Sequence, residues 1–148
     1  MLRRLLACSL TLGFAASEVI CAEWRPLPSS QYLVAAGFEH SDGGALVVMC
    51  DTRNNLISIS LVEPRAQWQP GEPIKITTRA VDGGELLPST GVVVASNQLV
   101  IDGESTADIL IMGQAKAFFA IDAGEYARIF PTANFRKATA PVLGACGR

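Results

Sequence analysis

The 148-residue sequence has a single histidine, His40, and none of its cysteines form a Cys-x-x-Cys pair. These two shortages argue against the usual zinc sites and against a thioredoxin-like redox motif. Basic residues are also scarce, because the net charge is −2 and no polybasic run occurs. The composition therefore predicts no nucleic-acid partner and no affinity for anionic lipids.

A long hydrophobic run is missing as well. Leu5 to Ala16 is the main apolar stretch near the start, and it is shorter than the roughly 20 residues that span a bilayer. Arg3 and Arg4 precede it, which is typical of a secretory signal peptide. We predict cleavage after Ala22, with Ser17 as the earlier alternative. No integral membrane segment would then remain, and the mature chain would be periplasmic or secreted.

The predicted organisation is a signal peptide over residues 1–22 and one domain over residues 23–148. Loss of the signal leaves ten basic and thirteen acidic residues in that domain. A lipid anchor is an alternative, since Cys8 and Cys21 lie near the signal. Cys8 comes too early for a lipobox, and bulky Ile20 stands where a small residue should precede Cys21.

Only Cys50 and Cys146 remain after cleavage. Two cysteines in an exported domain most simply form one disulfide, rather than a reactive thiol pair. By chain-entropy reasoning, a bond that closes a loop of this length contributes about 4 kcal/mol to stability. We therefore predict a structural disulfide between these two residues.

Short apolar runs separated by Gly, Pro, Asn and Asp predict a mainly β fold. The clearest strand is Leu56 to Glu63, in which Ile57, Ile59 and Leu61 alternate with smaller or polar residues. Further strands are predicted over 32–38, 45–51, 74–81, 91–95, 99–101, 117–122 and 126–130. The stretch Glu63 to Pro73 contains three prolines and predicts an irregular crossing.

Two helices interrupt the strands. Ser105 to Asp108 resembles a capping box that opens a short helix. A terminal helix is expected after a cap at Thr132 or Asn134, with a kink or an interruption at Pro141. Its core-facing positions recur at three- and four-residue spacing: Phe135, Ala138, Thr139, Val142 and Cys146. The predicted fold is a small antiparallel β-sandwich or barrel with a short helix and a C-terminal helix.

Catalytic chemistry has one local candidate, the sequence Glu39-His40-Ser41-Asp42. Neighbours in one loop cannot easily form a nucleophile, base and orienter, and as metal ligands they are too few, so we interpret this segment as a solvated turn. A hydrolase that uses paired carboxylates is an alternative, and its candidates lie near predicted turns: Asp82, Glu85, Asp102, Glu104 and Asp108. The glycine pairs at 43–44 and 83–84 lack the context of phosphate loops, so no cofactor is predicted.

Large aromatic residues are candidates for a binding surface, because such side chains often dominate interfaces. Trp24, Trp68 and Tyr126 are equally consistent with a core position. Trp68 lies between Gln67 and Gln69 in the proline-rich crossing, and it is our candidate for an exposed anchor.

Several segments resemble the invasion-associated locus B family of small exported bacterial proteins. They are Met49-Cys50-Asp51, Arg79-Ala80-Val81-Asp82-Gly83, and the ending from Phe135 to Cys146. The chain lacks that family's additional cysteines and has fewer basic residues. The resemblance implies an exported, non-enzymatic envelope protein that binds another protein. The alternatives are an inhibitor or accessory subunit of an envelope enzyme or secretion system, and the carboxylate-dependent hydrolase.

Overall fold

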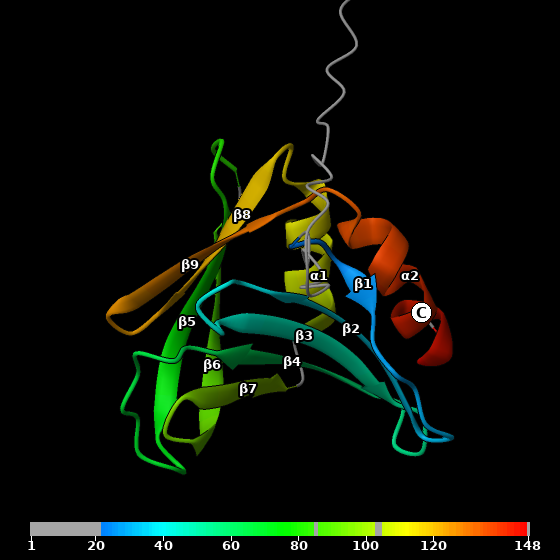
Figure 1. Cartoon of the computed structure of the whole chain (residues 1–148), viewed down its shortest axis with the longest axis horizontal. Helices are drawn as coiled ribbons and strands as arrows, with labels where there is room; N and C mark the ends of the chain where they lie inside the picture. The colour runs from blue at the N-terminus through cyan, green and yellow to red at the C-terminus, as the bar shows by residue number, and fades with distance from the viewer. Residues whose placement is uncertain (1–21, 85, 103–104, 148) are drawn as a thin grey trace, which may run out of the picture.

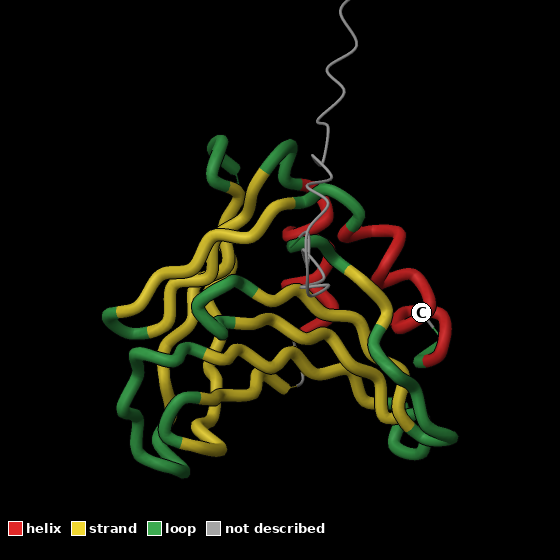
Figure 2. The backbone as a smooth tube through the Cα atoms, viewed as in Figure 1, coloured by secondary structure: helices red, strands yellow, loops and turns green. Residues whose placement is uncertain are grey.

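The computed structural model describes residues 22–84, 86–102 and 105–147, so the predicted signal peptide lies almost wholly outside the described residues. Within these ranges the chain forms nine strands and two helices (Figures 1 and 2). They are β1 (Arg25–Pro26), β2 (Leu33–Glu39), β3 (Ala45–Asp51), β4 (Leu56–Val62), β5 (Pro73–Ala80), β6 (Leu86–Ala95), β7 (Gln98–Asp102), α1 (Ser105–Gln114), β8 (Phe118–Ala123), β9 (Tyr126–Pro131) and α2 (Phe135–Ala145). The predicted mainly β class with two helices is confirmed.

All the strands belong to one antiparallel sheet in the order β1-β2-β3-β4-β7-β6-β5-β8-β9. Strand β7 joins the two halves because it pairs with β4 on one side and with β6 on the other. In Figure 1, β5, β8 and β9 run steeply across the direction of β2, β3 and β4. Among the described residues the sheet does not close, since β1 and β9 at its two ends form no ladder with each other.

The alternation in β4 places one face of the sheet in the core. Ile57, Ile59 and Leu61 are buried, as their spacing predicts. Each lies opposite a buried residue of β3, the pairs being Cys50 with Ile57, Val48 with Ile59 and Leu46 with Leu61. Cross-strand contacts of this kind stabilise the pairing of neighbouring strands in an antiparallel sheet.

Aromatic side chains fill the space between the sheet and the C-terminal helix. The cluster consists of Trp24, Phe38, Phe119, Phe130 and Phe135. Trp24 packs edge-on against Phe135, with ring centroids 4.8 Å apart. Its indole N–H donates a hydrogen bond to the carbonyl of Pro131, with 2.6 Å between the heavy atoms. Trp24 is therefore a core residue that also ties the start of the domain to β9.

The disulfide between Cys50 and Cys146 is present, as predicted. It joins β3 to the residue that follows α2, with the two Cα atoms 5.9 Å apart. The predicted inward positions of α2 are also buried, from Phe135 to Val142. Helix α2 packs against β2 and β3, whereas α1 packs mainly against β5.

Two details at α2 differ from expectation. Asn134 occupies the N-cap position, but its side chain forms no capping hydrogen bond and its φ is 63°, a left-handed conformation that asparagine tolerates. The helix then runs from Phe135 to Ala145 without an interruption at Pro141. The Ser105 side chain, which would cap α1 in the predicted capping box, lies outside the described part of the molecule.

Two strand segments were not predicted. Strand β1 covers part of the lead-in before β2, where it pairs Arg25 with Gly37. Strand β6 begins at Leu86, upstream of the predicted start at Gly91, and includes Pro88. Pro88 pairs with Thr77 of β5, while the ladder between β6 and β7 reaches only as far as Gly91. Among the described residues, β6 pairs only with β5 at this point, an arrangement that accommodates a proline.

Candidate functional site

The turn between β2 and β3 carries the only cluster predicted to hold an imidazole and carboxylates. The His40 ring lies between Phe38 and Phe130, with centroid distances of 5.0 and 5.1 Å. Burial lowers the pKa of His40, and the nearby Arg128 charge lowers it further, so the imidazole is neutral at pH 7. Ser41 is exposed in the turn, and Asp42 binds Arg128. These residues form a structural turn and not a nucleophile–base pair.

Asp42, Glu63 and Arg128 form a charged cluster, here called the seam cluster, where β9 approaches the other half of the sheet. Arg128 is 8% exposed and Glu63 is 0% exposed. The Arg128 guanidinium donates to both carboxylates: Nη1 and Nη2 bind Asp42 at 2.9 Å each, and Nε binds Glu63 at 2.8 Å. Arg65 also donates to Glu63, from Nε at 2.8 Å and Nη2 at 2.9 Å.

These contacts keep both acids ionised. The hydrogen bonds from Arg128 hold the pKa of Asp42 down to about 2. Hydrogen bonds from Arg65, followed by those from Arg128, hold the pKa of Glu63 well below its usual range despite burial. Together with Arg65, the seam cluster therefore has its charges balanced, and it links β9 to the β2–β3 turn and to the residue that follows β4.

Gly44 leaves space for the Arg128 side chain of the seam cluster. A Cβ atom at Gly44 would overlap the guanidinium of Arg128. The glycine pair at 43–44, predicted as a turn, thus also contributes a close approach that no larger residue permits.

The structure describes the side chains of two of the five candidate carboxylates, and their surroundings differ. Asp108 is buried on α1 and accepts a hydrogen bond from Thr78 Oγ1 at 2.8 Å. Asp82 is exposed in the turn after β5. Glu85 and Glu104 lie outside the described residues, as does the side chain of Asp102.

Trp68 is not the exposed anchor that we expected. Its side chain is only 8% exposed and packs edge-on against Tyr126, with centroids 5.7 Å apart. Ala66 is buried as well, whereas Gln67 and Gln69 are exposed. This two-residue alternation was visible in the sequence and points to a core position for Trp68.

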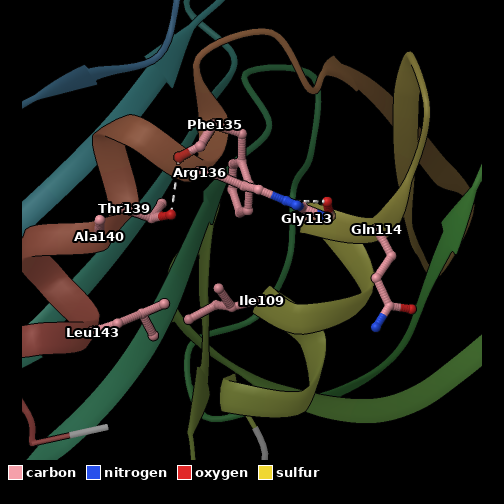
Figure 3. A pocket seen from close by; sticks show the side chains of 8 residues that line it. All are labelled: Ile109, Gly113, Gln114, Phe135, Arg136, Thr139, Ala140 and Leu143. Atoms are coloured by element: carbon pink, nitrogen blue, oxygen red, sulfur yellow. Dashed lines mark hydrogen bonds between the residues drawn. The ribbon is translucent and has the colours of Figure 1, made fainter.

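An apolar groove, here called the interhelix groove, lies between α1 and α2 (Figure 3). It has a volume of about 320 Å³. Its lining comes from both helices: Ile109, Gly113, Gln114, Phe135, Arg136, Thr139, Ala140 and Leu143. Figure 3 shows Ile109 and Leu143 pointing toward each other across the gap. The Thr139 hydroxyl donates to the carbonyl of Phe135 at 2.9 Å, which leaves the groove walls largely apolar.

A second cavity of about 400 Å³ adjoins the groove and contains three cations, Lys116, Arg136 and Lys137. We call it the cationic cavity. The two cavities share Gly113 and Arg136. Arg136 Nε donates to the carbonyl of Gly113 at 2.7 Å, so this side chain reaches from α2 to α1 (Figure 3).

No family model, curated protein or solved structure matches this chain. The site is therefore judged on its own geometry.

The geometry of these two cavities suits binding. The groove offers apolar contact, and the cationic cavity offers hydrogen-bond donors with positive charge. Across the described ranges, no three His, Cys, Asp or Glu side chains gather in a way that could hold a metal ion. No described helix is both long and apolar enough to cross a membrane. Sequence reasoning predicted both helices but missed the groove, because the groove depends on how the helices pack together.

Proposed function

We propose that this chain is an exported, non-enzymatic protein that binds another protein through the interhelix groove. The groove carries the proposal, because it is an open apolar cavity between two helices. The proposed occupant is an apolar side chain presented by a segment of the partner. Compartment and membership of the invasion-associated locus B family remain predictions from the sequence.

The size and lining of the groove support a protein partner. Its volume of about 320 Å³ is at the lower end for ligand cavities. Ile109 and Phe135 are buried, so the apolar surface that the groove still exposes comes from Ala140 and the half-buried Leu143. An apolar anchor placed against these two side chains would remove apolar surface from water on both sides. The adjoining cations would meet the polar part of the same segment.

The state of the titratable groups supports a binding role without catalysis. His40 is neutral and held between two phenyl rings. Glu63 and Arg128 are buried and bonded to each other. A general acid or base needs access to its substrate, and these groups lack it.

The test is site-specific photocross-linking in the cells that export the protein. A photoreactive amino acid replaces Ala140, which is exposed on the groove wall. The matched control places it at Ala127, which is exposed on β9 away from both helices. We expect one protein to cross-link from position 140 and not from position 127.

Blocking the groove completes the test. Leu143 lines the groove, and Leu143→Trp would fill it while Ala140 carries the photoreactive group. We expect the cross-link at position 140 to be lost in this variant. Equal cross-linking from both positions, or a cross-link that survives the filled groove, would contradict the proposal.

A further inference from the structure

We infer that the partner segment carries a carboxylate beside its apolar side chain, and that the cationic cavity of Lys116, Arg136 and Lys137 binds this carboxylate. The inference rests on the proposed function and names the chemistry of the partner. It follows from the junction of the two cavities, which share Gly113 and Arg136.

Arg136 connects the apolar and cationic parts. Its Nε is engaged by the carbonyl of Gly113, which fixes the guanidinium at the boundary between the cavities. The other guanidinium N–H groups remain to face an acceptor, and no described carboxylate pairs with them. A carboxylate is the acceptor that matches such a planar donor group.

Lys116 and Lys137 add two exposed charges to the same cavity. Within the described ranges, neither forms an ion pair. Two described acids share neighbouring cavities with these lysines: Glu23 lines one with Lys137, and Asp82 lines one with Lys116. These acids flank the cationic cavity but do not line it, so an anion from a partner has room between them.

Charge balance favours an acidic peptide over an anionic membrane. The chain as a whole has a net charge of −2, so three clustered cations are a local exception on an acidic protein. Electrostatic binding to lipid surfaces draws on clusters of about four to eight basic residues. A short acidic and apolar segment needs only the groove and the few charges beside it.

The test uses a displayed library of random linear peptides as the probe and the purified exported chain with its disulfide formed. We expect the selected peptides to combine Leu or Phe with nearby Asp or Glu. The charge-reversed variant is Lys116→Glu with Lys137→Glu. The matched control, Lys75→Glu with Arg53→Glu, makes the same charge change at exposed positions elsewhere.

We expect the charge-reversed variant to bind a selected acidic peptide about tenfold more weakly, because two attractive rim charges become repulsive. The control should bind it as the wild type does. Peptide binding should also weaken as salt is raised.

The outcomes separate this inference from the proposed function. If the selected peptides are apolar without acidic residues and do not bind the Leu143→Trp variant, the inferred carboxylate is wrong and the groove proposal stands. If the selected peptides bind the Leu143→Trp variant as strongly as the wild type, both the inference and the groove proposal are wrong. Binding to phosphatidylglycerol vesicles that is lost on charge reversal, with no peptide selected, would overturn the inference in favour of a membrane.

Discussion

Replacing Arg128 by Met should lower the free energy of unfolding more than the same replacement of its exposed neighbour Arg65. The Arg128→Met variant keeps an apolar stem of similar length but leaves the buried Glu63 carboxylate with Arg65 as its remaining cation. Breaking a buried ion pair from one side costs about 3 to 5 kcal/mol. Because Arg65 still donates to Glu63, we expect the lower end, about 3 kcal/mol.

Arg65→Met is the matched comparison. The Arg65 side chain is 62% exposed, although it binds the same carboxylate. Exposed ion pairs contribute little to stability, so Arg65→Met should lower the free energy of unfolding much less than Arg128→Met does. The difference between the stability losses of the two variants thus depends on how buried each arginine is, not on its number of hydrogen bonds to Glu63.

Urea unfolding, followed by tryptophan fluorescence, measures this directly, since Trp24 and Trp68 are both buried. With a slope of about 1.5 to 2 kcal/mol per M urea, the Arg128→Met midpoint should fall by about 1.5 to 2 M. Equal midpoints for the two variants would refute the argument that burial decides.

Acid provides an independent check on the seam cluster. The folded-state pKa values of Asp42 and Glu63 are lowered, that of Asp42 to about 2. Their stabilisation is therefore complete above the ordinary carboxyl pKa of about 4, and it is lost as pH falls toward 2. The wild-type advantage over Arg128→Met should shrink over that interval, and a constant difference down to pH 2 would contradict it.

Four further predictions concern the disulfide, two glycines and the N-terminus. Replacing Cys50 and Cys146 by Ser should lower the free energy of unfolding by about 4 kcal/mol, measured in urea, and an unchanged midpoint would count against this. Gly44→Ala should destabilise by about 1 to 3 kcal/mol through overlap with the seam cluster. Gly144→Ala, in open space on α2, should instead stabilise by about 0.5 to 1 kcal/mol, and thermal melts compare the two. Intact mass of the exported chain should correspond to a start immediately after Ala22. An uncleaved chain would contradict the predicted signal.

Elements with a strong local pattern were predictable from the sequence. The alternation in β4 and the three- and four-residue spacing in α2 each identify the buried face, because a single repeat length decides which side chains point inward. The disulfide was predictable for a different reason. Once the signal was assigned, Cys50 and Cys146 had no other cysteine with which to pair.

Features that depend on distant parts of the chain were missed. Pro88 is typical of a strand break in the local sequence, and its place in β6 depends on pairing with Thr77 of β5, which is distant in the chain. Glu63 reads as an ordinary surface acid, because its partner Arg128 is 65 residues away. The interhelix groove was missed in the same way, since no local pattern describes how α1 and α2 meet.

The open end of the sheet has a consequence for self-association. An edge strand offers unpaired backbone groups on which another chain can add a strand. On β9, the carbonyl of Pro131 is occupied by the Trp24 indole, and the backbone of Ile129 forms a hydrogen bond with the His40 ring. Side chains from the opposite end of the sheet thus cover positions that a fibril-forming neighbour would use. Removing Trp24 and the residues before it would uncover the Pro131 carbonyl, so we expect such a truncation to promote strand addition at β9.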